Sequence, residues 1–206
     1  MIFKIGNHRL KHGNIMDGID DLMAGAKAHF IYSDPPWGQG NLRYWQTINN
    51  KMTGAEKRDV VYDDFLVHFF KTIQKYSTDK VVLEYGCQWN EDIVQMSLAH
   101  GFKHNGSTVC YYKSGSNLKP CDLHFLSKTS NINLTDEFKK GCTEKEDLKL
   151  VQYIFDYLDI PEDGICLDPM CGMGFTAQSA INRGMTFYGN ELNLKRLNKT
   201  RARLEK

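Results

Sequence analysis

Short apolar runs alternate along this chain with longer stretches in which apolar residues recur at helical spacing. The runs predict buried strands at positions 29–33, 80–85, 164–168 and 185–189. Helices are expected at 60–76 and 144–158, where the helical spacing is clearest, and also at 90–100, 175–183 and 192–205. Strands that alternate with helices in this way favour an α/β fold with a doubly wound, mostly parallel sheet.

The segments between these elements predict smaller features. Positions 3–13 favour a strand pair, and 18–25 favour a short helix. Two β-rich runs, 107–113 and 122–128, are separated by turn-forming residues and predict an antiparallel hairpin at the edge of the sheet. The polar, glycine-containing stretch 38–59 is interpreted as a long loop with some helix.

The composition is that of an ordinary globular protein. The chain has 206 residues, 41% apolar and 25% charged, which is typical of a single domain spanning 1–206. No apolar run approaches the ~20 residues that a membrane span requires. The N-terminal segment lacks the apolar core of a secretion signal, so we expect a cytoplasmic protein with no membrane partner. The six cysteines form no C-x-x-C pair and lack zinc-site spacing with histidines, so free thiols and no metal site are expected.

The charge is unevenly distributed. The net charge is only +1, but positions 183–206 carry seven lysines and arginines against two acidic residues. Two interpretations stay open for this segment. It can lie along phosphates of a nucleic acid, or it can be a solvated amphipathic helix with basic residues near its C-terminus.

The motif Asp34-Pro35-Pro36-Trp37 directly follows the strand expected at 29–33. An exocyclic amine of a nucleic-acid base is a poor nucleophile because its lone pair is delocalised into the ring. The Asp34 carboxylate and the Pro35 carbonyl can each accept one amine proton and free that lone pair. Trp37 can stack on a base taken out of a duplex, which gains about 1–3 kcal/mol and compares with the cost of extruding the base. This chemistry suits methylation of an amino group; the alternative is a strand-terminating turn with a core tryptophan.

A second strand end has the form of a cofactor loop. Positions 168–174 read Asp-Pro-Met-Cys-Gly-Met-Gly, after a strand and before a helix. Gly172 and Gly174 allow the backbone to approach a ligand at a helix N-terminus. Asp168 can hold a cationic amino group, and Glu191, at the end of the next strand, can bind both hydroxyls of a ribose. A third glycine is missing and the loop comes late in the chain, which argues against an ordinary NAD-binding unit.

Together the two motifs resemble those of the β-class S-adenosylmethionine-dependent DNA amino-methyltransferases of the adenine-specific type. In that family a [D/N/S]-P-P-[Y/F/W] motif marks the catalytic strand end, and a D-P-F-x-G-x-G-type motif binds S-adenosylmethionine. The catalytic motif comes first here, which is the circularly permuted order of the β-class. The resemblance covers nearly the whole chain and implies a seven-stranded sheet with one antiparallel edge hairpin.

The resemblance also implies roles for individual residues, with S-adenosylmethionine as cofactor and DNA as substrate. It implies that the catalytic residues are Asp34, Pro35, Pro36 and Trp37. It implies cofactor contacts for Asn14, Asp34, Lys145, Asp168, Pro169, Met170, Gly172, Gly174 and Glu191. The chain departs from the family pattern at Met170, where phenylalanine is common, and at Met173-Gly174-Phe175, where Ser-Gly-Thr is common. Methionine keeps the apolar packing beside a cofactor.

Sequence recognition in the β-class is usually assigned to an insert before the cofactor loop, and here only 129–142 is available. The stretch 38–59 carries bases interleaved with aromatic residues, which suits nucleic acid, although a flexible lid is an equal alternative. These residues are Arg43, Tyr44, Trp45, Lys51, Lys57 and Arg58. We therefore expect short or relaxed sequence specificity, or recognition supplied by a partner subunit or a homodimer.

The expected reaction is direct, in-line transfer of the sulfonium methyl group to the amino group of adenine in DNA, with no covalent enzyme intermediate. Cytosine's amino group and an RNA adenine are alternative substrates. An alternative from another class is a catalytically silent subunit that binds nucleic acid.

Overall fold

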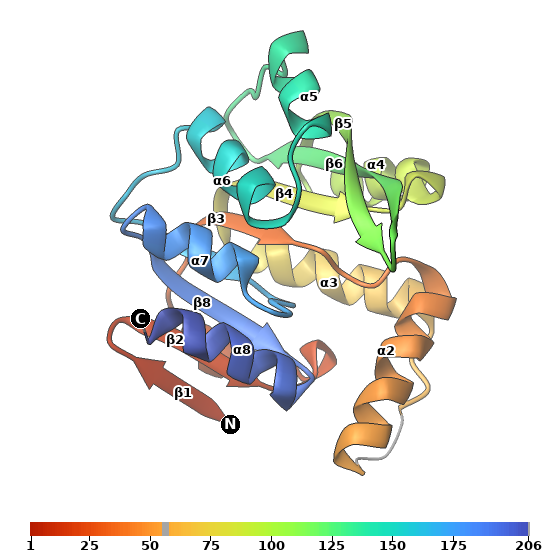
Figure 1. Ribbon diagram of the computed structural model, residues 1–206, viewed down its shortest axis with the longest axis vertical. Coiled ribbons are helices and arrows are strands. Elements are labelled where there is room, and N and C mark those ends of the chain that lie inside the picture. Colours follow the sequence, from red (N-terminus) through yellow and green to blue (C-terminus); the bar gives the residue numbers. More distant parts are fainter. Residues whose placement is uncertain (55–57, 206) are drawn as a thin grey trace.

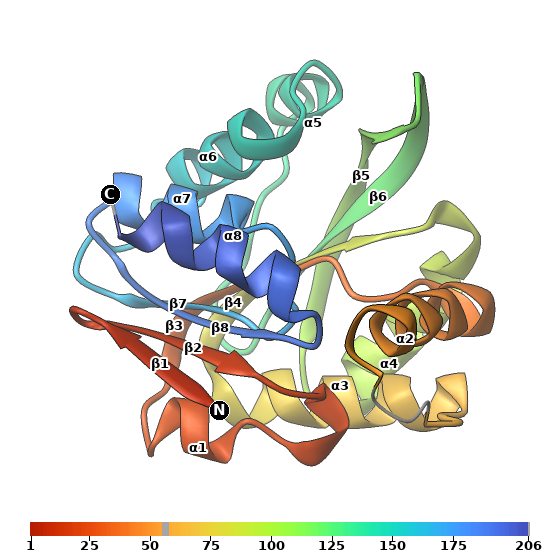
Figure 2. The ribbon, with the colours of Figure 1, turned by 60° about the horizontal axis from the view of Figure 1, so that its bottom comes forward.

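The computed structural model describes residues 1–54 and 58–205; Lys57 and Lys206 therefore lie outside the described residues. One eight-stranded sheet runs through the molecule, with helices on both faces. Helices α1, α3 and α4 cover one face, and α5, α6, α7 and α8 cover the other (Figures 1 and 2). No helix in these ranges is long and apolar enough to cross a membrane.

The strands are β1 (Ile2–Ile5), β2 (His8–His12), β3 (Ala28–Ser33), β4 (Ser77–Tyr85), β5 (Lys103–Ser114), β6 (Asn117–Ser127), β7 (Ile165–Asp168) and β8 (Thr186–Glu191). The α-helices are α1 (Asp20–Met23), α2 (Gly38–Thr53), α3 (Tyr62–Tyr76), α4 (Asn90–Ala99), α5 (Asp136–Thr143), α6 (Asp147–Tyr157), α7 (Phe175–Asn182) and α8 (Leu194–Leu204). Two 3-10 turns, η1 (Ile15–Asp17) and η2 (Cys87–Trp89), follow β2 and β4.

The strand order is β1-β2-β8-β7-β3-β4-β6-β5. The five strands from β2 to β4 are parallel, and β1, β5 and β6 join their neighbours antiparallel. The predicted α/β fold is therefore confirmed, but the predicted number of seven strands and single edge hairpin is wrong. The pair at 3–13 forms a second hairpin, whose strand β2 pairs with β8 and so extends the same sheet to eight strands.

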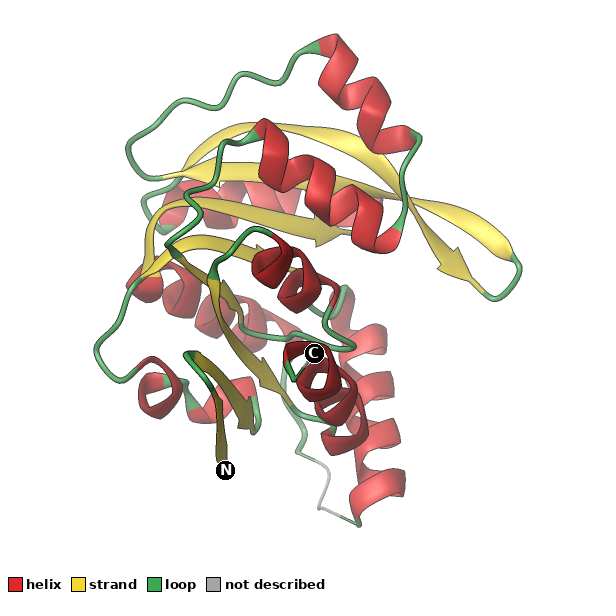
Figure 3. Cartoon of the chain, turned by 60° about the vertical axis from the view of Figure 1, so that its left-hand side comes forward, coloured by secondary structure: helices red, strands yellow, loops and turns green. Residues whose placement is uncertain are grey.

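The edge hairpin β5–β6 is longer than predicted. Its strands pair from Lys103 with Ser127 to Ser114 with Asn117, so the turn is only Gly115-Ser116. Gly115 has a φ of 64°, which suits such a tight turn. The far end of the hairpin projects from the body of the protein (Figure 3).

Two segments expected to be loop or link are helical. Most of 38–59 is the 16-residue helix α2, which ends at Gly54 in the left-handed conformation. The segment 129–142, considered above as a recognition insert, contains most of α5, which follows the N-cap Thr135 and buries Phe138 in the core. Because its apolar face packs against the sheet, α5 belongs to the fold itself.

Each face of the sheet has its own apolar core. On the α3 side, Phe65, Phe69 and Ile73 pack against the sheet at helical spacing, as predicted. On the other side, Phe155 from α6 meets Phe30 from β3 edge to face, with ring centroids 4.8 Å apart. The two cores fix the strands between them, so that the residues beyond the strand ends are held in defined positions.

Candidate active site

A cavity of about 340 Å³ opens beyond the carboxyl ends of the parallel strands. Ligands bind at this edge in open α/β sheets. Its lining residues are Gly13, Asn14, Ile15, Met16, Asp34, Pro35, Pro36, Trp37, Asn41, Leu42, Trp45, Gln46, Asn49, Phe65, Glu84, Tyr112, Lys113, Met170, Asn190, Glu191, Leu192, Asn193 and Arg196. The whole Asp-Pro-Pro-Trp motif and Glu191 therefore share one cavity, together with Asn14 and Met170.

The two predicted strand ends lie side by side. Strands β3 and β7 are parallel neighbours, with Ile31 opposite Leu167. The Ser33 hydroxyl donates a hydrogen bond to the Asp168 carboxylate at 3.1 Å. The switch in strand order between β7 and β3 therefore places the Asp-Pro-Pro-Trp motif directly beside the predicted cofactor loop.

Asp34 lines the cavity, and its side chain is exposed to solvent. Desolvation by the cavity walls raises the pKa of the Asp34 carboxyl, and the negative charges of Glu84 and Asp168 raise it further. The positive charge of Arg196 acts in the opposite direction. A carboxylate in this environment has a high affinity for a proton or for another cationic group.

The remaining motif residues are held by the neighbouring strands. The Trp37 indole donates to the carbonyl of Glu84 at 3.2 Å, and the Tyr85 hydroxyl donates to the carbonyl of Pro36 at 3.1 Å. The ring of Trp37 meets Tyr112 of β5 at an interplanar angle of 87°, with centroids 5.0 Å apart. These contacts fix the turn and give the cavity an aromatic wall next to Asp34.

Asp168 lies behind the cavity and is not among its lining residues. It is 4% exposed, and its oxygens accept hydrogen bonds from Thr176 at 2.8 Å, from the Met170 backbone at 3.1 Å and from Ser33. Burial raises the pKa of Asp168 to about 7, against the effect of these donors. The contacts of this carboxylate hold the loop in place. Its contact with a cofactor amine stays a prediction.

The two glycines of the loop are required by helix packing. Gly172 and Gly174 have φ values of 52° and 82°. A Cβ at Gly172 would lie 2.7 Å from Nη2 of Arg196, and a Cβ at Gly174 would lie 2.9 Å from the backbone of Thr200. Neither glycine lines the cavity. Their small size lets α8 approach the loop closely, which differs from the predicted approach of the backbone to a ligand.

Glu191, at the end of β8, is buried against this loop and faces the cavity. One carboxylate oxygen accepts from the Gly172 backbone at 2.9 Å and the other from the Asn193 backbone at 2.7 Å. Burial raises the pKa of Glu191, and Arg196 opposes this shift. The carboxylate is thus held rigidly, with its cavity side available to hydroxyl donors.

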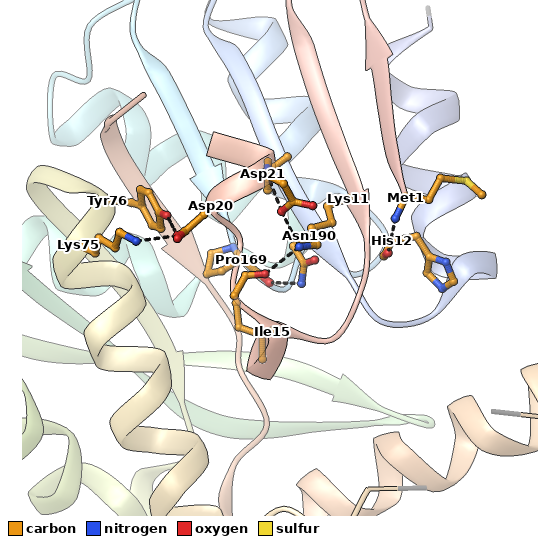
Figure 4. Close-up of polar contacts among 12 residues, drawn as sticks. Met1, Lys11, His12, Ile15, Asp20, Asp21, Lys75, Tyr76, Pro169 and Asn190 are labelled. Atoms are coloured by element: carbon orange, nitrogen blue, oxygen red, sulfur yellow. Dashed lines mark hydrogen bonds and ion pairs between the residues drawn. The ribbon is translucent and has the colours of Figure 1, made fainter. Parts of the chain in front are cut away.

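The other predicted cofactor residues take different positions. Asn14 lines the cavity and caps η1 by accepting from the Met16 backbone at 3.0 Å. The Pro169 carbonyl accepts from the Asn190 amide at 3.1 Å (Figure 4) and lies outside the lining. Lys145 also lies outside it; its ammonium group is 4.1 Å from the centroid of Tyr153 and donates to the Gly141 carbonyl. The structure thus does not bring Lys145 to the cavity.

The structure adds residues to the cavity that the sequence did not predict, Glu84 among them. Glu84 is the penultimate residue of the strand predicted at 80–85, which the structure pairs with the motif strand β3, and this position near a strand end was the signal that could have found it. Its carboxylate accepts from the Tyr32 hydroxyl at 3.0 Å and from the Cys121 thiol at 3.5 Å. Burial raises the pKa of Glu84 as well. The cavity thus contains a second carboxylate close to Asp34.

Glu84 also belongs to a cluster of possible metal donors. Its carboxylate and the thiols of Cys110 and Cys121 lie within 4.8 Å of one another. The sulfur atoms of the two cysteines, which are paired across β5 and β6, are 3.2 Å apart. The hairpin, and not the spacing along the chain, brings these groups together.

The sequence matches no family model and no curated protein. The fold is similar to that of M1.HpyAVI in complex with SAM, with a TM-score of 0.65 and 15% identity over 96% of this chain and 98% of that one. TTHA0409 from Thermus thermophilus, named as a candidate DNA modification methylase, gives 0.65 and 16% over 96% and 94%. PvuII DNA methyltransferase, a cytosine-N4-specific enzyme, gives 0.63 and 12% over 97% and 87%. At these identities the likeness shows that this chain has the same fold.

Proposed function

We propose that this protein transfers a methyl group from S-adenosylmethionine to the exocyclic amino group of a base in DNA, with adenine as the preferred base. The observation that carries the proposal is the meeting of Asp34 and Glu191 in one cavity. Both the amine-binding motif and the ribose-binding carboxylate then face the same ligand space. The motif order, with the catalytic strand end first, supports the permuted β-class arrangement.

The cavity fits the cofactor on its own chemistry. Glu191 offers a fixed carboxylate to the two ribose hydroxyls, and Asn14 and Met170 lie in the same lining. The buried Asn190 presents an Oδ1 that has no hydrogen-bond partner among the described residues. S-adenosylmethionine supplies an electrophilic methyl group on a positively charged sulfur, which suits the negative charges of Asp34 and Glu84.

The chain's own residues then position the amine. The Asp34 carboxylate and the Pro35 carbonyl would accept hydrogen bonds from its two N–H groups, which frees the nitrogen lone pair for in-line attack on the methyl carbon. Trp37 stacks on the extruded base, and Tyr112 stands edge-on beside it. After transfer the nitrogen carries a positive charge and an extra proton, which the Asp34 carboxylate can accept because its pKa is raised. Catalysis therefore rests on positioning and electrostatics.

The solved neighbours support DNA as the substrate, since their names describe DNA-modifying enzymes. Cytosine is the second candidate base, because PvuII DNA methyltransferase of the same fold is cytosine-N4-specific. We further propose that base-sequence recognition is short, or comes from a second copy or partner. The segment 129–142 supports this, since α5 within it packs into the core. An RNA adenine and a silent nucleic-acid-binding subunit remain as alternatives.

The experiment that tests the proposal is mass spectrometry of nucleosides from DNA, and in parallel from RNA, incubated with the protein and isotopically labelled S-adenosylmethionine. Labelled N6-methyladenine is expected. Labelled N4-methylcytosine would show that the target base is cytosine. Labelled N6-methyladenine from RNA but not from DNA would show that the substrate is RNA. No labelled nucleoside from either nucleic acid, with the cofactor bound, would favour the silent subunit.

A further inference from the structure

Helix α2 forms one wall of the cavity. The residues that line the cavity from this helix include Leu42, Trp45, Gln46 and Asn49, which follow the i, i+3, i+4, i+7 pattern of a single helix face. Tyr44, on another face, is 55% exposed. The helix thus turns a face of mixed apolar and polar residues toward the cavity, which explains why its apolar periodicity was too weak to predict its full length.

Helix α2 touches the cofactor side of the cavity. The Arg196 guanidinium of α8 lies over the Trp45 ring, 4.4 Å from its centroid. The amide of Asn193, the N-cap of α8, lies 3.2 Å from the sulfur of Met52. Both partners follow Glu191 within five positions of the chain. The wall formed by α2 therefore meets the end of the cavity where Glu191 lies.

Four buried polar atoms around this end have no hydrogen-bond partner among the residues that the structure describes. Two are on α2, Oε1 of Gln46 and Oδ1 of Asn49, and two are on the opposite side, Oδ1 of Asn190 and Nε of Arg196. Gln46 is only 8% exposed and Asn190 only 1%. Leaving such an atom unsatisfied costs about 1–3 kcal/mol, and native proteins keep few of them. Their concentration at one cavity indicates a polar ligand that supplies the missing partners.

We propose that α2 completes the cofactor site, with Gln46 and Asn49 forming hydrogen bonds to the adenosine portion of S-adenosylmethionine. This inference rests on the proposed function. A side-chain amide both donates and accepts, which matches the ring edge of adenine and the ribose hydroxyls. Trp45, held by Arg196, closes the wall beside them. The adenosine portion is assigned because α2 meets the cavity where Glu191 and Asn193 lie.

The test is the dissociation constant for S-adenosylmethionine and for S-adenosylhomocysteine, measured by calorimetry on the full chain. Gln46→Ala and Asn49→Ala are each expected to raise both constants about tenfold, since the two ligands share the adenosine portion and each variant loses one hydrogen bond. Thr47→Ala is the matched control on the same helix. The Thr47 hydroxyl donates to the Arg43 carbonyl at 2.8 Å, so this variant is expected to bind both ligands as the parent does.

The outcomes separate the inference from the function on which it rests. Parent protein that binds neither ligand contradicts the proposed function itself. Parent that binds while both alanine variants bind equally well, or lose only affinity for DNA, overturns the role of α2. Thermal unfolding of each variant is measured beside binding. If Gln46→Ala does not fold, Asn49→Ala, at a more exposed position, decides the question alone.

Discussion

The Ser33 hydroxyl and the Asp168 carboxylate are joined by a hydrogen bond of 3.1 Å that connects the ends of β3 and β7. Ser33 immediately precedes the Asp-Pro-Pro-Trp motif, and Asp168 begins the glycine loop. This buried contact adds to the pairing of β3 with β7 and helps to hold the Asp-Pro-Pro-Trp motif beside the glycine loop.

Removal of the Asp168 side chain is expected to destabilise the protein. In Asp168→Ala the buried hydroxyls of Ser33 and Thr176 and the Met170 backbone N–H lose their acceptor. We expect a loss of about 3 kcal/mol in the free energy of unfolding, measured by urea titration. Asp163→Ala, at an exposed position before β7, is the control and is expected to change stability little. Equal stability of both variants would show that the Asp168 contacts are unimportant.

Gly174→Ala is expected to weaken the fold near the loop. Gly174 has a φ of 82°, and an added Cβ would meet the Thr200 backbone at 2.9 Å. Backbone strain together with the displacement of α8 is expected to cost about 2 kcal/mol or more in the free energy of unfolding. Gly40→Ala, which has open space around its Cβ and lies within α2, is expected to be neutral or slightly stabilising. A stable Gly174→Ala protein would contradict the packing role.

Glu84→Gln is expected to change the pH dependence of methyl transfer. The negative charge of Glu84 raises the pKa of Asp34. In the proposed mechanism Asp34 must be ionised to accept a hydrogen bond from the amine and, after transfer, its proton. Activity therefore falls as the pH drops through the pKa of Asp34. Removing the charge of Glu84 lowers that pKa, so the acidic limb of the kcat/KM profile is expected to move to lower pH.

This experiment has a matched control in Glu162→Gln, an exposed site in the connection before β7. Its profile is expected to coincide with that of the parent. An unmoved limb in Glu84→Gln, or a limb displaced to higher pH, would show that Glu84 does not act on Asp34 by its charge.

Asp79 makes a separate contribution to stability. Partial burial would raise its pKa, but hydrogen bonds from Ser130, Thr129 and Lys128 lower the pKa of Asp79 to about 2. Because the folded pKa is depressed, the stabilisation is complete above the ordinary carboxyl pKa and is lost as the pH falls toward 2. After allowance for solvent screening we expect about 1 kcal/mol.

The check is urea unfolding of the parent and of Asp79→Asn at neutral and acidic pH. The difference in the free energy of unfolding is expected to be present near neutral pH, and to shrink as the pH is lowered through the interval between about 4 and about 2. A difference that stays constant down to acidic pH would mean that the asparagine disrupts the turn for a reason other than charge.

Much of the fold followed from the apolar pattern because strands such as β3, β4 and β7 are continuous buried runs. The length of helix α2 was underestimated because Gly38, Gly40 and its asparagines have poor helix propensity, and because much of its inner face lines a cavity. Helix α5 is short and polar apart from Phe138 and Cys142. Pattern reasoning detects elements that bury an apolar face, and both helices give little such signal.

The site likewise has some residues that the sequence could predict and others that it could not. Asp34 and Glu191 were predictable because each ends a strand and so lies at the ligand-binding edge of the sheet. The buried carboxylate of Asp168 accepts a hydrogen bond from Thr176, which lies eight positions later in the first turn of α7. No sequence pattern indicated that contact. Glu84, near the end of a predicted strand, could have been found by the same reasoning. Arg196 and the inner face of α2 reach the cavity through tertiary packing, which a single sequence does not display.

The most direct test of the central claim is methyl transfer to DNA by Asp34→Ala, measured in single turnover alongside its dissociation constant for S-adenosylmethionine. The account predicts that transfer is almost abolished while the cofactor still binds, because Asp34 engages the amine and Glu191 with its neighbours holds the cofactor. Substantial transfer by the variant would contradict the role assigned to Asp34.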